Sequence, residues 1–457
     1  LEDFFAKLAP KLEKGRPFFW LGDTAWLLFK NLNLEETLIY LDNRALKDFT
    51  VIQATLVHEE NYANLAGSPA LIGNDFGEPN PSEREGDYWP YVRKVVDEAK
   101  ERGMYFALLP SWGCFVSRGD LSGERIDRYT DHLAKWFGEC DNVIWLLGGD
   151  VRGSDAPEEF ARLGRALREK CPGQLIGFHP FGRTSSTQWF AGADWLDFHM
   201  FQSGHRRYDQ LRMNEWDDKA DAETFVGEDN YRYVQHDREI QPARPVLDGE
   251  PSYEWILQGL HDPAQPYWKT ADVRRYAYWS TLAGAAGFTY GSNGIMQFWK
   301  GGDDGKFGVF ETWREAMHDP GSVQMKHLSY WLRHMDFASG RPAQHRLPEN
   351  KGTQYAYNLA LETDKGLLVY SYSGEPFVLE TGGLNTAKAW WITMSWMGRW
   401  RPTPRYRRSL LPPAPPARTS PPIRICSWMS ATIIPKPLRT ILHWPRKSWV
   451  RTSSPLP

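Results

Sequence analysis

The chain has 457 residues and a net charge of −3, and its hydrophobic fraction of 41% and charged fraction of 24% are those of a globular protein. This length suffices for one barrel of about 250 to 300 residues plus a small second domain, and no apolar run approaches the roughly 20 residues that span a bilayer. Four cysteines without CxxC spacing indicate neither a zinc site nor a disulfide framework. No glycine fingerprint for phosphates is present, so no cofactor is expected.

Predicted strands alternate with predicted helices through the first 290 residues. Apolar runs that end in glycine or polar residues predict strands at 18–23, 50–57, 104–110, 142–150, 175–179, 195–202, 244–250 and 287–290. Helical spacing predicts helices at 34–47, 89–102, 123–137, 157–170, 208–220 and 272–285. Eight strands that alternate with helical stretches favour an α/β fold of the (β/α)8 TIM-barrel type over an open doubly wound sheet, with the active site at the carboxyl ends of the strands.

The pattern changes after about residue 320 to short alternating runs with turns between them, which predicts a small antiparallel β-sandwich domain. We therefore expect a catalytic barrel at 1–320, a sandwich-like domain at 321–395 and a tail at 396–457. Because the tail breaks the strand pattern, the sandwich is expected to be incomplete. The sequence opens at Leu1 without a signal-like segment, so we expect a fragment or mature form, and neither cellular location nor oligomeric state follows.

The C-terminal tail has an unusual charge and composition. Residues 391–457 contain no Asp or Glu and 12 basic residues, which leaves 42 basic against 57 acidic residues in the acidic body of the chain. The tail is also rich in proline and has no glycine after Gly398. An out-of-frame translation is the favoured interpretation, ahead of a solvated, disordered Pro/Arg-rich segment and of a nucleic-acid-binding arm. Nucleic acid is therefore not an expected partner.

Two predicted strands end on glycine and an acid. The run from Asn142 stops at Gly148-Gly-Asp150, and the run from Arg244 stops at Gly249-Glu250. The glycines allow sharp turns at the strand ends, so both carboxylates are expected to face one cleft. Two carboxylates across a cleft are what glycosidic bond cleavage requires. Structural ion pairs at strand ends are the alternative.

Other side chains fall at the predicted rim of the barrel and are candidates for binding a sugar. They are Asp23, Trp26, His58, Glu59, Trp112, His179, Gln202, His205, Tyr253, Asn293 and Trp299. Asp23 either accepts hydrogen bonds from sugar hydroxyls or caps the following helix. Trp112 either stacks on a sugar or plugs the barrel mouth. Tyr253 and Glu254 are expected to orient Glu250, and Asn293 and Trp299 either shape the pocket or support the fold.

The histidines His179, His199 and His205, together with His58 and Glu59, lack the spacing of a helical metal-binding pair. Hydrogen bonding to substrate or satisfied core positions are favoured over a metal site. No metal is therefore expected, although a metal-dependent hydrolase stays among the alternatives.

Several long motifs resemble the apiosidase-like glycoside hydrolases of family 140. They are Pro17-Phe-Phe-Trp-Leu-Gly-Asp-Thr-Ala-Trp26, Phe49-Thr-Val-Ile-Gln53, Trp145-Leu-Leu-Gly-Gly-Asp150, Asp197-Phe-His-Met-Phe-Gln-Ser-Gly-His205 and Asp248-Gly-Glu-Pro-Ser-Tyr-Glu254. The resemblance covers roughly residues 15–392 and implies a (β/α)8 barrel followed by a β-sandwich labelled collagen-binding. It also implies a retaining glycosidase that removes an apiose-like pentose from pectic side chains, with Asp150 as acid/base and Glu250 as nucleophile. Beyond Trp391 the sequence departs from that family.

The chemistry of the two acids fits these roles. A retaining enzyme holds its carboxyl groups about 5 to 5.5 Å apart. Asp150 needs a raised pKa to stay protonated near neutrality, and the charge of Glu250 would raise it. A separation of 8 Å or more would favour an inverting mechanism. A carbohydrate-binding protein on an inactive barrel and a metal-dependent hydrolase are the alternative functions.

Overall fold

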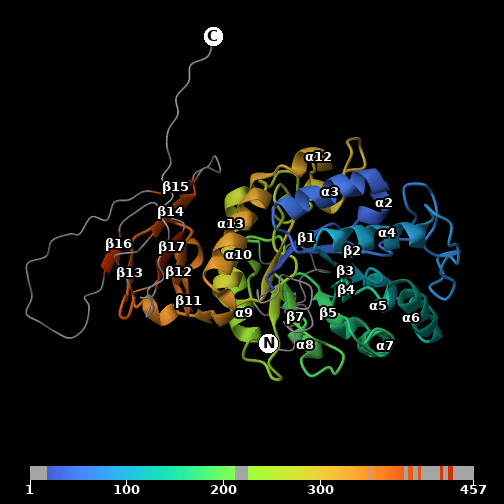
Figure 1. Cartoon of the computed structure of the whole chain (residues 1–457), viewed down its shortest axis with the longest axis horizontal. Helices are drawn as coiled ribbons and strands as arrows, with labels where there is room; N and C mark the ends of the chain where they lie inside the picture. Colours follow the sequence, from blue (N-terminus) through green and yellow to red (C-terminus); the bar gives the residue numbers. More distant parts are fainter. Residues whose placement is uncertain are drawn as a thin grey trace, which may run out of the picture.

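The computed structural model (Figure 1) describes residues 18–210, 225–349 and 352–384, and beyond them the backbone of four short strands between residues 390 and 435. All structural statements below concern these residues. The predicted helix at 208–220 lies mainly outside them, and residues 208 and 209 form a turn.

The larger part of the chain is a sheet of nine strands surrounded by helices. The strand order is β5-β4-β3-β2-β1-β9-β8-β7-β6. The strands are β1 (Trp20–Thr24), β2 (Val51–Thr55), β3 (Tyr105–Leu109), β4 (Val143–Val151), β5 (Leu175–Pro180), β6 (Thr184–Ser185), β7 (His199–Gln202), β8 (Val246–Asp248) and β9 (Gly287–Tyr290). Each hydrogen-bonded pair is parallel except β6 with β7. The eight predicted strands correspond to β1–β5 and β7–β9.

The sheet curls into a nearly closed barrel because the residues before β7 reach β5. The Asp197 amide donates to the Ile176 carbonyl at 2.8 Å. Gly177 leaves room for the ring of Phe198, since a Cβ at this glycine would lie 2.3 Å from the ring. The parallel strands and surrounding helices therefore make a TIM-barrel-like α/β fold, as predicted.

Helices follow the strands on the outside of the barrel (Figure 1). The longer ones are α3 (Leu34–Leu46), α4 (Tyr88–Glu101), α6 (Glu124–Phe137), α7 (Pro157–Lys170), α9 (Asn230–Asp237), α10 (Thr270–Leu282) and α13 (Pro320–His334). Short helices are α2 (Leu28–Asn31), α5 (Cys114–Ser117), α8 (Thr187–Phe190), α11 (Asn293–Met296) and α12 (Trp313–Ala316). Local sequence sets their starts: the Asn33 side chain accepts from the Glu36 amide at 2.9 Å, and Pro157 occupies the first turn of α7. None of these helices is long and apolar enough to cross a membrane.

Tryptophans fill much of the core. The fully buried ones are Trp20, Trp89, Trp145, Trp195, Trp268, Trp279 and Trp313. Inside the barrel, the Trp20 indole donates to Thr289 at 3.1 Å, and Thr289 donates to Gln53 at 3.0 Å. Gln53 in turn donates to the carbonyl of Gly249 at 3.0 Å. This chain of hydrogen bonds fixes the backbone just before Glu250 from within the barrel.

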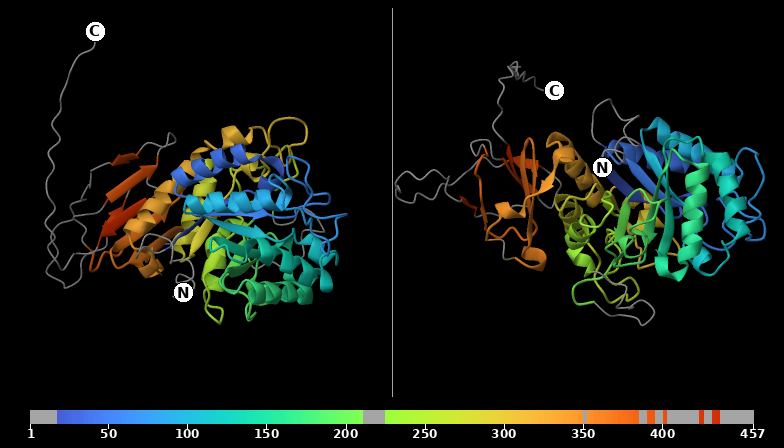
Figure 2. Two further views of the ribbon diagram at one scale, coloured as in Figure 1. Left: turned by 45° about the vertical axis from the view of Figure 1, so that its right-hand side comes forward. Right: turned by 90° about the horizontal axis from the view of Figure 1, so that it is seen from below.

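The C-terminal region consists of antiparallel sheets beside the barrel, with α10 and α13 between them and the barrel strands (Figures 1 and 2). One sheet has the order β10-β11-β12-β17-β14-β15 and the other pairs β13 with β16. The strands are β10 (Arg341–Pro342), β11 (Asn358–Thr363), β12 (Gly366–Ser371), β13 (Phe377–Leu379), β14 (Trp390–Met394), β15 (Trp400–Pro402), β16 (Ile423–Ile425) and β17 (Ala431–Pro435). Three of them, β15, β16 and β17, fall within the predicted tail; the rest of that tail lies outside the described residues.

Residues 320–334 differ from the expected start of a β domain, because they form helix α13. Its buried residues Met325, Leu328 and Leu332 recur at helical spacing. The helix packs on α10, where Arg274 donates to Gln324 at 2.6 Å. The alternating strands begin after it, at β10.

Candidate active site

Three consecutive residues with positive φ end β4 and aim Asp150. Gly148, Gly149 and Asp150 have φ values of 88°, 109° and 51°. A Cβ at Gly148 would lie 2.2 Å from the His179 carbonyl oxygen, and one at Gly149 would lie 2.8 Å from the Trp112 ring. Glycine is therefore needed at both positions for conformation and for space. The resulting bulge in the β4–β5 pairing turns the Asp150 side chain out of the strand pattern.

Glu250 lies two residues beyond β8, in a backbone fixed from both sides. Gly249 packs against the Met200 side chain, since a Cβ there would lie 2.3 Å from its sulfur. The Glu250 carbonyl accepts the amide of Gly204 at 3.0 Å. With a side chain only 6% exposed, the carboxylate has one defined position.

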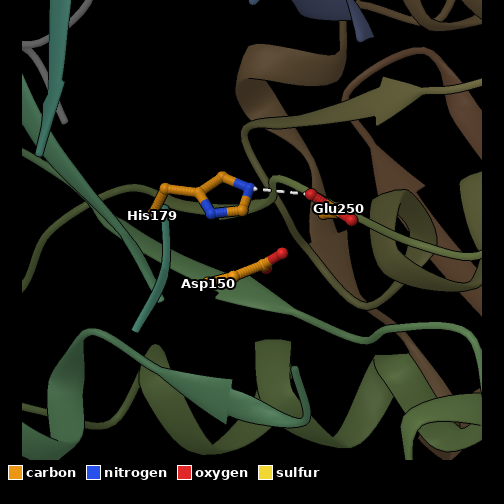
Figure 3. Close-up of side chains that lie close together, drawn as sticks. All are labelled: Asp150, His179 and Glu250. Carbon is orange, nitrogen blue, oxygen red and sulfur yellow. Dashed lines mark ion pairs between the residues drawn. The ribbon is translucent and has the colours of Figure 1, made fainter. Parts of the chain in front are cut away.

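The two acids meet although 100 residues separate them. Carboxylate oxygens of Asp150 and Glu250 and a ring nitrogen of His179 all lie within 4.8 Å of one another. Figure 3 shows the Asp150 side chain directed toward the space between His179 and Glu250. The geometry therefore brings together the two carboxylates that the sequence singled out.

Two histidines hold the Glu250 carboxylate. His205 Nε2 lies 2.9 Å from Oε1, and His179 Nε2 lies 3.3 Å from Oε2. Burial by itself raises the pKa of Glu250, but the contacts with His179 and His205 outweigh it and lower that pKa to about 2. Glu250 is thus ionised over the whole physiological range.

Asp150 has the opposite shift. Its carboxyl reaches solvent, yet protein surrounds it closely enough that lost hydration, followed by the charge of Glu250, raises its pKa to about 6. The positive character of His179 and a hydrogen bond from Gln202 oppose this rise. One acid of the pair is therefore charged while the other keeps a proton in mildly acidic solution.

Aromatic side chains surround the acids. The Trp26 ring lies 5.2 Å from His179 and 5.3 Å from Trp112 between ring centroids, and its indole donates to the Tyr253 hydroxyl at 3.2 Å. His58 lies 4.5 Å from Trp112, and burial lowers its pKa to about 4. These rings form an apolar wall with few polar tips, which suits the C–H face of a sugar.

Asp23 does not face this wall, contrary to expectation. Its side chain is fully buried and accepts from Arg44 and from the Tyr40 hydroxyl, each at 2.5 Å. Side chains alternate along β1, and Trp20 and Gly22 adjoin Thr289 inside the barrel, so Asp23 points outward to α3. Burial raises the pKa of Asp23 even though Arg44 opposes that rise. Asp23 therefore anchors helix α3 through Tyr40 and Arg44. It does not cap a helix, and it does not face the wall where a sugar would bind.

The same alternation identifies a neighbour that the sequence prediction missed. Thr24 follows Asp23 and shares the inner face with Gly22, where its side chain contacts the Tyr253 hydroxyl. Burial and the neighbouring charge of Glu250 raise the pKa of Tyr253 well above its usual value. Counting strand alternation from Trp20 would have found Thr24.

The surroundings of three other candidates distinguish among their expected roles. Glu59 is half exposed and pairs with Lys30 at the surface. Asn293 is fully buried, where its amide donates to the carbonyls of Trp255 and Phe307 at 3.2 and 3.0 Å, so it supports the fold. Trp299 is half-buried on the loop after β9, with its indole beside Gly305.

Among the described residues, Asp150, His179 and Glu250 each place one possible metal-ligand atom within 4.8 Å of the other two. Two carboxylates and an imidazole are acceptable ligands for zinc. In this arrangement His179 is engaged with Glu250. A metal-dependent hydrolase is accordingly the alternative that a chelator tests.

Comparison with known proteins supports a glycoside hydrolase. The family model described as the apiosidase-like catalytic domain matches residues 10–339. A solved structure described as a glycoside hydrolase is 33% identical with a TM-score of 0.82, covering 93% of this chain and 94% of its own. A glycoside hydrolase family 5 structure from Bacteroides vulgatus has the same identity and TM-score and covers 93% and 90%. No curated protein sequence matches this chain.

Proposed function

Because this chain belongs to the apiosidase-like family and is a glycoside hydrolase, we propose that it cleaves its substrate with retention of configuration, through a covalent glycosyl-enzyme. Glu250 is the nucleophile and Asp150 the acid/base. The observation that carries this proposal is the separation of at most 4.8 Å between one carboxylate oxygen of each acid. An inverting enzyme needs about 6.5 to 9.5 Å between its carboxyl groups, because a water molecule attacks from between the base and the sugar.

The two pKa shifts support this division of roles. Glu250, with its pKa lowered to about 2, is charged and ready to attack the anomeric carbon. Asp150, with its pKa raised to about 6, holds the proton that the leaving oxygen needs. Once Glu250 is esterified its charge disappears, so the pKa of Asp150 falls. Asp150 then takes a proton from the attacking water.

The substrate is proposed to be a terminal, apiose-like pentose on a pectic side chain of the plant cell wall. Membership of the apiosidase-like family supports this choice, as does the aromatic wall of Trp26 and Trp112. The side chains proposed to contact the sugar are Trp26, His58, Trp112, Gln202 and Tyr253. His179 and His205 hold the nucleophile.

The finer classification and the domain plan belong to the same proposal. We place the chain in glycoside hydrolase family 140, with a catalytic barrel that extends through α13, beyond the predicted end at 320, and then a β-sandwich with which strands β15–β17 of the predicted tail pair. The family match to residue 339 and the packing of α13 on α10 support a barrel unit that extends through α13.

Hydrolysis of a panel of aryl pentosides and pectic side-chain oligosaccharides tests the proposal. Wild type is expected to release sugar, Glu250→Ala to lose turnover, and the exposed control Glu101→Ala to keep it. Added azide should restore turnover to Glu250→Ala, because a small anion fills the place of the missing carboxylate and attacks the sugar.

The alternatives give different results in the same assay. Turnover by Glu250→Ala without azide would contradict the covalent mechanism. Loss of wild-type activity on chelation, with recovery on adding zinc, would favour the metal-dependent hydrolase. Binding of the oligosaccharides without any turnover by wild type would favour a carbohydrate-binding protein.

A further inference from the structure

The loop at 203–208 carries His205 and is fixed at several points along its length. The Ser203 hydroxyl donates to Asp248 at 2.9 Å. The His205 carbonyl accepts from the Trp268 indole at 3.0 Å and from the Gly259 amide at 2.8 Å. These hydrogen bonds involve Ser203 and His205, and the end of the loop at Tyr208 is held by other contacts.

Glu228 holds that far end. It lies in a single 3-10 turn, η3 (Gly227–Asp229), and is fully buried. Its Oε1 accepts the Tyr208 amide at 2.9 Å, while Oε2 lies 2.7 Å from Arg275 Nη2. Gly227 packs directly on the loop, since a Cβ there would lie 1.9 Å from the Ser203 carbonyl oxygen. The turn and the loop are therefore closely packed and joined by a hydrogen bond, and we treat them as one unit.

The C-terminal region reaches this unit through Tyr355, whose ring lies 5.4 Å from the Tyr208 ring between centroids. Tyr355 OH donates to the Glu228 carboxylate, with distances of 2.9 and 3.0 Å to its two oxygens. The Arg275 guanidinium lies over four rings, two from α10 and two from the C-terminal region: Tyr276, Trp279, Tyr355 and Tyr372. Tyr372 also belongs to this interface, but its hydroxyl donates to Asp272 at 3.0 Å and not to Glu228.

We propose that Tyr355 is a positioning residue for the active site: it orients Glu228, Glu228 holds the backbone of Tyr208, and the loop thereby keeps His205 against Glu250. The inference rests on the proposed role of Glu250 as nucleophile. It gives the C-terminal region a function in catalysis, because that region supplies the outermost member of the chain of contacts.

The consequence is a measurable effect at the nucleophile. His205 is one of the contacts that keep Glu250 ionised. A looser loop weakens that contact, so the protonated, inactive form of Glu250 should appear at higher pH. A purely structural role for Tyr355 would lower stability and leave the pH profile unchanged.

The experiment compares Tyr355→Phe with Tyr372→Phe, which removes a hydroxyl from the same interface without touching Glu228. In Tyr355→Phe we expect kcat to fall about fivefold with little change in KM, and the acid limb of the kcat/KM profile to move up by about half a pH unit. Tyr372→Phe should keep the wild-type profile. Equal profiles for the two variants, or an unmoved acid limb in Tyr355→Phe, would overturn the proposal.

A second measurement separates this proposal from the proposed function. In histidine-labelled protein, the ring signals of His205 should shift in Tyr355→Phe and stay in place in Tyr372→Phe. A shifted His205 signal in a protein without glycosidase activity would mean that the positioning holds and the assigned reaction is wrong. An unshifted signal in an active enzyme would refute the positioning alone.

Discussion

Asp150 and Glu250 carry opposite pKa shifts while their nearest carboxylate oxygens lie at most 4.8 Å apart. His179 and His205 contact Glu250, whereas Asp150 accepts a hydrogen bond from Gln202. This asymmetry of partners decides which acid loses its proton first. In the proposed mechanism, Glu250 attacks and Asp150 donates.

The pH dependence of kcat/KM should reflect this asymmetry. Glu250 must be ionised, so activity is lost as the pH falls through its pKa of about 2. Asp150 must be protonated, so activity is lost as the pH rises through its pKa of about 6. We expect a bell-shaped profile with its maximum in the acidic range between these limits.

Replacing His179 tests the acid side of that profile. His179→Ala removes one of the contacts that lower the pKa of Glu250, so the acid limb should move to higher pH. The exposed residue His318 offers a control, and His318→Ala should leave both limbs in place. An unchanged acid limb in His179→Ala would contradict the assigned contact.

The turn that aims Asp150 should not tolerate a side chain. Gly148→Ala forces a residue with φ of 88° into about 1 to 2 kcal/mol of strain and places a Cβ 2.2 Å from a backbone oxygen. Displacement of Asp150 by about 1 Å should lower kcat about 100-fold. Gly173 has open space and no positive φ, so Gly173→Ala should keep wild-type kcat. Near-normal kcat in Gly148→Ala would show that the turn is not required.

The buried pair of Asp23 and Arg44 should matter for stability and not for substrate affinity. Asp23→Ala leaves the buried Arg44 guanidinium without its carboxylate, which should cost about 3 to 5 kcal/mol in free energy of unfolding. The surface pair of Asp42 and Arg102 provides the control, because Asp42→Ala should cost less than about 1 kcal/mol. Denaturant unfolding measures both. A raised KM with unchanged stability in Asp23→Ala would return Asp23 to the binding site.

Much of the barrel could be predicted from local sequence. Buried strands such as β9 and helices such as α7 have clear apolar patterns and clear ends, and their predicted bounds agree with the structure within about three residues. Strand ends with glycine and an acid located Asp150 and Glu250, because parallel strands in a barrel present their carboxyl ends at one face.

The errors concern information that is not local. Its place at the end of a strand predicts Asp23 at the rim, but which face a strand residue occupies depends on the register with β2 and β9. Local sequence leaves two roles open for Asn293, because no pattern places beside it the loops whose Trp255 and Phe307 carbonyls it contacts. The contact of Tyr355 with Glu228 spans 127 residues and has no local signal at all.

The anomeric configuration of the first product tests the central claim most directly. With methanol present as an alternative acceptor, wild type forms a methyl glycoside, which does not mutarotate, so its anomeric configuration can be determined by proton NMR. Attack by Glu250 followed by attack of methanol inverts the anomeric carbon twice, so the product should have the configuration of the substrate. A methyl glycoside of the opposite configuration would contradict the covalent role of Glu250 and the assignment of these two acids.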